Sequence, residues 1–326
     1  MPLTRLRPWI AAATLLVAGA AHAYVDVVVF GDSLSDGGNV AALIGTDPGQ
    51  VIDGNTYVPS MPYASGTFTN GATWVDGFAA ALGTTAAPSL LGGTNYAFGG
   101  AQTRDESNGS PSLISQLGMY LDATGGLASS DSLYVLAGGG NNARAALEAI
   151  GFEGAPPLRT ALATAVAYAR DVGQMVDALQ AAGATDIIVW NAPNIGLTPA
   201  VGSLGSEASF LAGVIGNVMN QALARRLEGE AGVRIFDVYG LVGAVAADPA
   251  AYGLDNVTDA CGAAVNGCDP ATALFWDGIH PTAAGHAILT DAMIAVAVPE
   301  PGTWALFVAG GAVLLARRRR RQAGTS

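Results

Sequence analysis

Val-Asp-Val-Val-Val-Phe-Gly-Asp-Ser-Leu, residues 25–34, combines an apolar run with a glycine turn. Its apolar part, Val25 to Phe30, is typical of a strand buried in a parallel sheet, and it ends in a glycine turn. Similar strands are expected at 132–137, 186–190 and 233–238, and segments with helical periodicity at 72–82, 112–121, 158–182, 207–228 and 283–296. This alternation predicts an α/β three-layer sandwich, in which helices cover both faces of a central, mostly parallel sheet.

The charge distribution separates the two ends of the chain from its middle. The 326 residues include 14 basic residues, all arginine, and 26 acidic residues. Seven arginines lie near the ends (Arg5, Arg7 and 317–321), so the middle carries 25 acidic against 7 basic residues, a net charge of about −18. Nucleic acid is therefore not expected as a partner, because phosphate binding relies on clustered Lys and Arg. The length of the middle part suits one large domain, residues 24–298.

The first 23 residues are predicted to be a secretory signal peptide. A short basic start is followed by an apolar stretch from Trp9 to Ala20 and by the small-x-small sequence Ala21-His22-Ala23. Signal peptidase accepts that pattern, so the mature chain is expected to start near Tyr24. The alternative is an uncleaved membrane anchor, for which the apolar stretch is short.

The C-terminal segment, residues 299–326, resembles a PEP-CTERM sorting signal. Pro299-Glu300-Pro301 precedes an apolar run from Trp304 to Ala316, and five arginines follow. The resemblance implies a transmembrane helix, a basic cytoplasmic tail and a sorting enzyme that cuts near the Pro-Glu-Pro motif. The product would be released or held at the cell surface; the alternative is a permanent tail anchor. In either case we expect the membrane to be contacted only through the terminal segments.

Two long Gly-, Pro- and Asn-rich stretches, 46–70 and 248–273, are expected to be loops that shape a binding site. The second contains the only two cysteines, Cys261 and Cys268. In an exported protein these predict a local disulfide.

No metal site is expected, because no cluster of His, Cys and carboxylate residues is evident. Asp255, Asp259 and Asp269 could together bind calcium, but a solvated acidic loop is the favoured interpretation.

Candidate catalytic residues follow the first strand and lie near the end of the domain. Ser33 lies on the turn after the first strand, where sites in such folds are found. Asp277 lies three residues before His280 with a glycine between them, so its carboxylate can turn back to meet the imidazole. His22 leaves with the signal peptide, and a structural role is expected for His286, which leaves His280 as the neutral-pH base. The plain alternative is a buried histidine satisfied by Asp277.

Four sequence blocks in this order resemble the GDSL lipase/esterase family, also called SGNH hydrolases. The blocks are 31–34 (Gly-Asp-Ser-Leu), 95–101 (Asn-Tyr-Ala-Phe-Gly-Gly-Ala), 139–142 (Gly-Gly-Asn-Asn) and 277–280 (Asp-Gly-Ile-His). Residues 191–196 also resemble a loop of the family's lipase-like members. The resemblance implies an SGNH hydrolase-like, flavodoxin-like fold over nearly the whole domain.

The same resemblance implies roles for individual residues. Ser33 would be the nucleophile, His280 the base and Asp277 the group that holds the imidazole. The oxyanion hole would consist of the backbone N–H groups of Ser33 and Gly100 and the side-chain amide of Asn141. The family requires no cofactor and no metal.

Two further residues, Asp32 and Asn142, are expected to support the site. The family usually has aspartate where this chain has Asn142. An amide accepts hydrogen bonds but carries no charge, so rate and fine geometry, rather than reaction class, depend on this difference.

The sequence therefore predicts an exported serine esterase or lipase that cleaves carboxylic esters through an acyl-enzyme. One alternative is an acetylesterase acting on extracellular polysaccharide. Another is a non-catalytic surface or matrix protein on a hydrolase scaffold. The excess of acidic residues favours soluble esters or neutral glycans over bulk membrane lipid as substrates.

Overall fold

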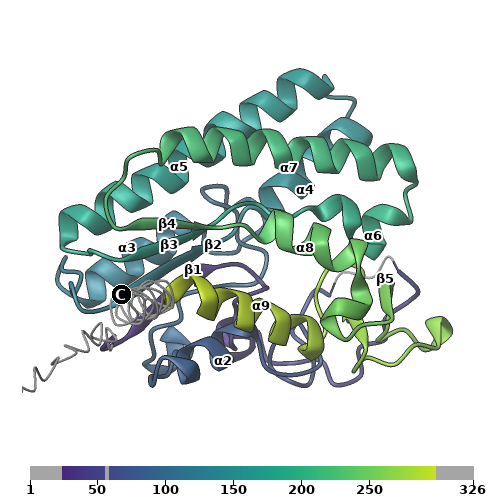
Figure 1. The fold of residues 1–326 in the computed structure, drawn as a ribbon, viewed down its shortest axis with the longest axis horizontal. Helices are drawn as coiled ribbons and strands as arrows, with labels where there is room; N and C mark the ends of the chain where they lie inside the picture. The colour runs from purple at the N-terminus through teal and green to yellow at the C-terminus, as the bar shows by residue number, and fades with distance from the viewer. Residues whose placement is uncertain (1–23, 56–58, 299–326) are drawn as a thin grey trace, which may run out of the picture. The chain divides into compact units, whose positions relative to one another are not determined.

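Four parallel strands form the central sheet in the order β1-β2-β3-β4 (Figure 1). They are β1 (Val27–Gly31), β2 (Leu133–Ala137), β3 (Ile187–Trp190) and β4 (Val233–Phe236). The computed structural model describes residues 24–55 and 59–298, so the predicted signal peptide and sorting segment lie outside the described residues. All four predicted strands are present.

Alternate side chains of each strand enter two separate cores. In β1, Val28 and Phe30 pack in one core, and Val27 and Val29 in the other. The first core lies under α3 (Leu113–Ala123), α4 (Gly140–Gly151), α5 (Pro157–Ala182) and α7 (Ser206–Arg226). The second lies over α2 (Trp74–Ala81) and α9 (Ala283–Ala297). The strand period of two thus buries the sheet on both faces, which confirms the predicted three layers (Figure 1).

The strand predicted at 233–238 is two residues too long. It ends at Phe236, and Asp237 caps a helix that was not predicted, α8 (Val238–Ala247), by accepting a hydrogen bond from the Gly240 N–H at 2.8 Å. The apolar residues of α8 continue the pattern of the strand, so only the cap separates the two elements. Helix α4 and the short helices α1 (Asn39–Ile44) and α6 (Pro199–Gly202) were not predicted either.

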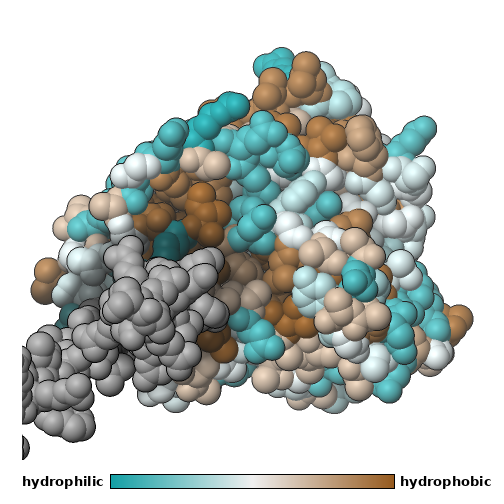
Figure 2. Space-filling model, viewed as in Figure 1, coloured by the Kyte–Doolittle hydropathy of each residue, from teal (hydrophilic) through white to brown (hydrophobic). Residues whose placement is uncertain are grey.

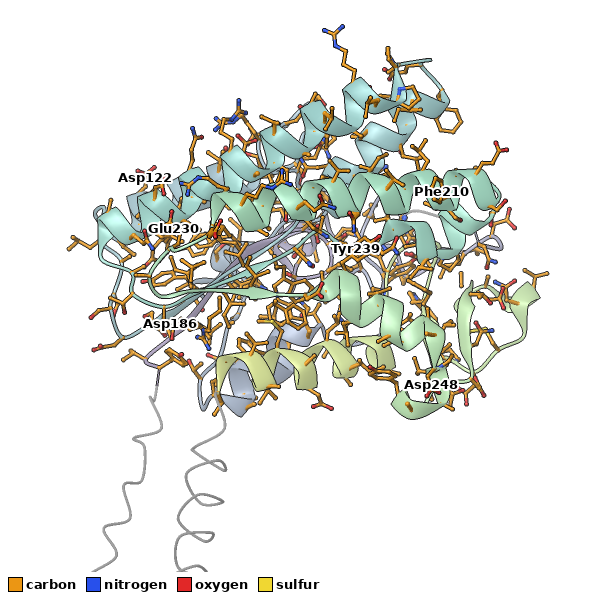
Figure 3. The ribbon with its side chains drawn as sticks, turned by 45° about the horizontal axis from the view of Figure 1, so that its top comes forward. Asp122, Asp186, Phe210, Glu230, Tyr239 and Asp248 are labelled. Atoms are coloured by element: carbon orange, nitrogen blue, oxygen red, sulfur yellow. A yellow bond between two sulfur atoms is a disulfide. The ribbon has the colours of Figure 1, made fainter. Side chains whose placement is uncertain are left out.

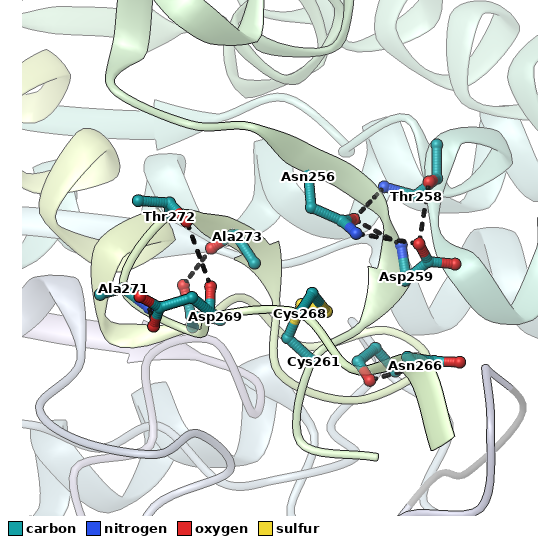
Figure 4. The surroundings of a disulfide bond; sticks show 12 residues. Asn256, Thr258, Asp259, Cys261, Asn266, Cys268, Asp269, Ala271, Thr272 and Ala273 are labelled. Atoms are coloured by element: carbon teal, nitrogen blue, oxygen red, sulfur yellow. Dashed lines mark hydrogen bonds between the residues drawn. A yellow bond between two sulfur atoms is a disulfide. The ribbon is translucent and has the colours of Figure 1, made fainter. Parts of the chain in front are cut away.

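The long segment 248–273 is more ordered than a loop. It contains β5 (Asn256–Ala260), which pairs in parallel with β6 (Ala273–Phe275) at the end of the segment to form a small second sheet. Cys261 and Cys268 form the predicted disulfide, with 5.4 Å between their Cα atoms (Figure 4).

Residues from the two long segments pack together in a small core. Ile52 and Tyr63 come from the first segment, and Ala260 and Ala263 from the second. Trp276 packs against them, one residue before Asp277. The two segments therefore pack together next to Asp277, one of the candidate catalytic residues.

No helix within residues 24–55 and 59–298 is long and apolar enough to cross a membrane. In the same ranges, no three His, Cys, Asp or Glu side chains gather as metal ligands would. Asp259 accepts a hydrogen bond from the side-chain amide of Asn256, and Asp269 accepts one from the Ala271 N–H (Figure 4). Asp259 also accepts from the side-chain amide of Asn55.

Candidate active site

The turn after β1 is fixed by the close approach of β2. A Cβ atom on Gly31 would lie 2.6 Å from the carbonyl oxygen of Ala137, so only glycine fits there. The Gln116 amide of α3 bonds both the N–H and the carbonyl of Gly31, each at 2.8 Å. The chain then turns tightly, because the N–H groups of Ser35 and Asp36 both donate to the Asp32 carbonyl. Ser33 lies on this turn, just beyond the carboxyl end of β1.

Asp277 and His280 lie on a turn that follows β6. The N–H groups of Ile279 and His280 both donate to Asp277 Oδ1 at 2.8 Å. These two bonds turn the carboxylate back toward the histidine, as the spacing predicted. The His280 carbonyl accepts from the Trp276 N–H at 2.8 Å, which closes the turn from the other side.

Ser33, His280 and Asp277 form one chain of hydrogen bonds. His280 Nε2 lies 2.8 Å from Ser33 Oγ, and His280 Nδ1 lies 2.7 Å from Asp277 Oδ2. Asp277 is fully buried, and His280 and Ser33 are buried. The fold thus joins two turns 247 residues apart into the arrangement in which a histidine can take a proton from a serine.

Of the three predicted oxyanion donors, two line the cavity that His280 lines and one does not. Ser33 and Asn141 line the same cavity as His280, and the Asn141 amide also donates to the Ala101 carbonyl at 3.0 Å. Gly100 does not line that cavity. It has φ +80° and lies on the loop that carries Ala101. Within the part of the chain that the structure describes, the N–H groups of Ser33 and Gly100 have no hydrogen-bond acceptor.

Asp36 joins the first two sequence blocks. Its Oδ1 accepts from the N–H groups of Gly38 and Asn39, and its Oδ2 accepts from the Gly99 N–H at 2.9 Å. Asp36 thereby fixes the residue before Gly100 to the turn that carries Ser33. Burial raises the pKa of this carboxyl, and the N–H donors oppose the shift. Sequence reasoning did not find this role of Asp36, because an aspartate in a turn is common.

Asn142 connects the site to a carboxylate on α5. Its amide accepts from the Thr103 N–H at 3.2 Å and donates to Thr103 Oγ1 at 3.1 Å. Thr103 Oγ1 in turn donates to Asp171 Oδ2 at 3.2 Å, and Asp171 is buried. The Asp171 carboxylate is therefore linked to Asn142 through the side chain of Thr103.

An apolar cavity opens beside the three triad residues. It has a volume of about 90 Å³, and Ser33, Asn141 and His280 are among its lining residues. Its apolar lining comes from five elements and the turns between them: Leu34, Pro193, Ile195, Val201, Val238, Val242, Phe275, Ile279 and Leu289. Apolar walls around convergent polar groups are typical of a ligand-binding pocket.

Asp32 lines the same cavity and is buried. Burial raises the pKa of Asp32 from 3.8 to about 6, while the Leu34 N–H and the charge of His280 oppose the shift. The folded protein therefore holds this proton at pH values where the unfolded chain has lost it. It follows that the Asp32 carboxyl makes the free energy of unfolding fall as the pH rises from about 4 to about 6.

Asp32→Asn removes this buried charge and is expected to stabilise the protein at neutral pH. The amide oxygen can still accept from the Leu34 N–H, which bonds Asp32 Oδ1 at 3.0 Å. The gain over wild type should grow between pH 4 and pH 6 and then level off, at about 1 to 3 kcal/mol. Urea unfolding of both proteins at pH 4, 5, 6 and 7.5 measures it. A gain that does not change with pH would contradict the expectation.

His286 has a structural position. It is buried on α9, and its Nδ1 accepts from the Trp74 N–H at 3.2 Å at the start of α2. Burial lowers the pKa of His286 to about 3. It therefore stays neutral at physiological pH and ties α9 to α2, while His280 faces Ser33.

Tyr63 contacts the triad although sequence reasoning did not single it out. Its hydroxyl donates to Asp277 Oδ2 at 2.7 Å, the same oxygen that meets His280 Nδ1. Tyr63 is buried and packs edge-on against Trp276. Phe68, from the same long segment, lies with its ring centre 5.5 Å from that of His280. No local pattern marks a contact between residues 214 positions apart.

Tyr63→Phe is expected to lower kcat about tenfold and to change KM little, because Tyr63 holds Asp277 on the side away from the substrate cavity. The lost hydrogen bond to a carboxylate should also lower the free energy of unfolding by about 1 to 2 kcal/mol. Tyr120→Phe is the matched control, since the Tyr120 hydroxyl bonds the Tyr134 hydroxyl in the core at 2.9 Å. Steady-state kinetics of both variants check the expectation, and equal values of kcat would contradict it.

The fold and the site together define an α/β protein with a serine–histidine–aspartate triad beyond the carboxyl ends of a parallel sheet. The chain belongs to the GDSL-like Lipase/Acylhydrolase family, whose sequence model matches residues 27–293. Residues 297–321 match the PEP-CTERM protein-sorting motif. Both resemblances expected from the sequence are confirmed.

Named relatives include esterases and lipases. The chain is 30% identical to Esterase EstA of Pseudomonas putida over 364 residues, which cover 88% of this chain and 49% of that protein. It is 33% identical to Lipase 1 of Photorhabdus luminescens over 194 residues, 60% of this chain and 26% of that protein. The chain thus spans about half the length, or less, of the curated relatives it matches.

Among solved structures, the chain is similar to an extracellular lipase from Streptomyces rimosus. The sequence identity is 18%, the TM-score is 0.45, and the match covers 83% of this chain and 99% of the lipase. An acetylxylan esterase from Geobacillus stearothermophilus matches with 14% identity, a TM-score of 0.40, and coverage of 83% and 93%.

Proposed function

We propose that the protein is an exported serine esterase or lipase that hydrolyses carboxylic esters through an acyl-enzyme. The observation that carries this proposal is the 2.8 Å contact between His280 Nε2 and Ser33 Oγ, with Asp277 on the other ring nitrogen. His280 takes the Ser33 proton as Oγ attacks the ester carbonyl carbon, and then gives it to the leaving alkoxide. Water, activated by His280, attacks the acyl-enzyme and releases the carboxylic acid. Asp277 stabilises the imidazolium formed in each half-reaction.

The charge that develops on the carbonyl oxygen would be held by the N–H groups of Ser33 and Gly100 and by the Asn141 amide. The absence of an acceptor for these two N–H groups among the described residues supports that role. So does the fact that Asn141 and Ser33 line the same cavity.

Asn141→Ala is expected to lower kcat by about 10²- to 10³-fold while the protein stays folded, because one oxyanion donor is lost. KM should change much less, since the donor acts mainly on the charge of the transition state. Steady-state kinetics with thermal unfolding as a fold check measure both effects. Asn217→Ala on the exposed face of α7 is a matched control. An unchanged kcat would remove Asn141 from the proposed site.

The cavity favours an ester with an extended acyl group over an acetyl ester. Its walls are apolar, and its volume of about 90 Å³ exceeds what a methyl group needs. Each methylene that enters such a site gains up to about 0.8 kcal/mol, or about fourfold in kcat/KM. Acetylated polysaccharide, the second candidate substrate, offers only one methyl group to these walls.

Labelling tests the function most directly. Fluorophosphonate treatment of the protein should modify Ser33, as mapped by peptide mass spectrometry. A series of p-nitrophenyl esters from acetate to dodecanoate should then show kcat/KM rising with chain length. Failure to label Ser33 would overturn the esterase proposal, and a maximum at acetate would leave the esterase but favour the acetylesterase.

The proposed location is the cell surface or the extracellular space. The PEP-CTERM motif implies export and processing by a sorting system. Residues 1–23 would be removed by signal peptidase, and residues 299–326 would provide the transmembrane helix and the cleavage site. Mass spectrometry of the protein recovered from the producing cells tests both cleavages.

A further inference from the structure

Arg144 places a positive charge in the wall of a largely apolar cavity. Figure 2 shows that hydrophilic side chains are spread over the face of the molecule in view, where water solvates charged groups. Arg144 is only half-buried, but it lines the cavity that Ser33 and His280 line. In the described part of the chain it is the only arginine or lysine that does so. No step of the proposed ester hydrolysis uses this cation.

Helix α4 brings the Arg144 guanidinium to the side-chain amide of Asn141. The two residues are three apart at the start of the helix, so their side chains share one face. Arg144 Nη2 donates to Asn141 Oδ1 at 3.5 Å, and Asn141 Nδ2 donates to the Ala101 carbonyl at 3.0 Å. Because 3.5 Å is long for a hydrogen bond, the first contact acts mainly through the attraction between the guanidinium charge and the amide oxygen.

These two contacts select one orientation of the Asn141 amide. Half a turn of the amide would place its NH₂ group against the guanidinium and its oxygen against the Ala101 carbonyl, so two attractions would become two repulsions. In the observed orientation one N–H of Asn141 bonds Ala101 and the other remains for an oxyanion. The positive charge beside Oδ1 also draws electrons from the amide nitrogen, which makes the remaining N–H a stronger donor.

Arg144 occupies this position at a cost to the fold. Its Nε–H is buried and has no hydrogen-bond acceptor among the residues that the structure describes. A buried donor without an acceptor destabilises a folded protein. The ion pair with Glu148, at 2.9 Å, offsets little of this, because both side chains reach solvent. Local violations of this kind are expected at functional sites, where function rather than stability determines the residue.

We propose that Arg144 is a positioning residue for the oxyanion hole. Its charge orients and polarises the Asn141 amide, and the amide holds the charge that develops on the carbonyl oxygen. The inference rests on the proposed esterase function and on the role proposed for Asn141. Arg144 acts through Asn141 and does not contact the reacting atoms. Its charge therefore contributes to kcat and not to the stability of the fold.

Arg144→Met removes the charge and keeps a long unbranched side chain. With p-nitrophenyl butyrate, a neutral ester, we expect kcat to fall about tenfold and KM to change less than about twofold. Thermal unfolding should give a Tm within about 2 °C of wild type or above it, since the unpaired Nε–H is lost together with the ion pair. Arg159→Met is the matched control. Arg159 is exposed on α5 and forms no ion pair within the described residues, so this variant should keep kcat, KM and Tm.

A double-mutant cycle with Asn141→Ala separates positioning from direct action on the substrate. Without the amide, Arg144 has nothing to orient. Adding Arg144→Met to Asn141→Ala should therefore lower kcat less than about twofold. A tenfold loss in both backgrounds would overturn the proposal, because Arg144 would then act on the ester itself.

Two other results would also overturn the role of Arg144. One is an unchanged kcat in Arg144→Met. The other is a fall in Tm of more than about 5 °C in that variant, which would assign Arg144 to the support of α4. Wild-type protein is tested first with fluorophosphonate and with the same ester. If it neither labels at Ser33 nor cleaves the ester, the esterase proposal fails and this inference fails with it, whereas a fully active Arg144→Met removes the role of Arg144 alone.

Discussion

Ser33→Ala is expected to lower the hydrolysis of a p-nitrophenyl ester by about 10⁴- to 10⁶-fold. Without Oγ no acyl-enzyme can form, and His280 has no hydroxyl from which to take a proton. Only attack by water, helped by whatever oxyanion stabilisation the site provides, would remain. The variant should also lose all labelling by fluorophosphonate. Steady-state rates and gel fluorescence measure these two effects.

Ser35→Ala is the matched control for this experiment. Ser35 is fully buried on the same turn, and its Oγ accepts from the indole N–H of Trp74 at 3.1 Å. It makes no hydrogen bond to His280 among the residues that the structure describes. We therefore expect this variant to lose some stability but to keep fluorophosphonate labelling. Undiminished turnover by Ser33→Ala would show that the nucleophile is a different residue.

The sheet could be predicted because three of its strands, β1, β2 and β3, are buried on both faces, whereas the edge strand β4 is only partly buried. Such strands are apolar runs bounded by turns, and Val27 to Phe30 is the clearest of them. Helix boundaries were harder where strand and helix are both apolar. Only Asp237 marks the step from β4 to α8, and no change of hydrophobic period accompanies it. Helix α4 begins with Gly140-Asn141-Asn142, residues that favour turns when considered locally.

The candidate site could be predicted as far as its local motifs extend. The carboxylate of Asp277 meets His280 through a three-residue turn, and sequence spacing determines such contacts. Tyr63 and Asp171 act at long range, and no pattern in their own segments indicates the residues they meet. The same holds for the cavity, whose apolar walls come from five elements that only the fold brings together.

The structure also changes what the acidic composition implies for the substrate. The sequence favoured soluble esters or neutral glycans over lipid, because the domain carries about 25 acidic residues. The apolar cavity beside Ser33 is a local exception to that composition. We therefore give more weight to esters with an apolar acyl group than composition alone would.

Asp277→Asn is expected to lower kcat/KM by about 10⁴-fold, because it forces His280 into the wrong tautomer. Four donors converge on the carboxylate: the N–H groups of Ile279 and His280 on Oδ1, and the Tyr63 hydroxyl and the His280 ring on Oδ2. Asparagine has one oxygen, and the two fixed backbone donors require it at the Oδ1 position. Its NH₂ group then faces His280 Nδ1, which must accept, so Nε2 carries the proton and cannot take one from Ser33.

Kinetics and folding measurements on one preparation separate this effect from simple damage to the fold. Tyr63 can rotate its hydroxyl to accept from the new amide, so Asp277→Asn keeps a hydrogen-bond partner for every group and should unfold cooperatively, as wild type does. Asp122→Asn, an exposed change on α3, removes the same charge without touching the triad (Figure 3). It should keep full activity. A loss below about tenfold in folded Asp277→Asn would mean that His280 keeps its tautomer without the carboxylate, and Asp277 would then serve the turn rather than the proton transfer.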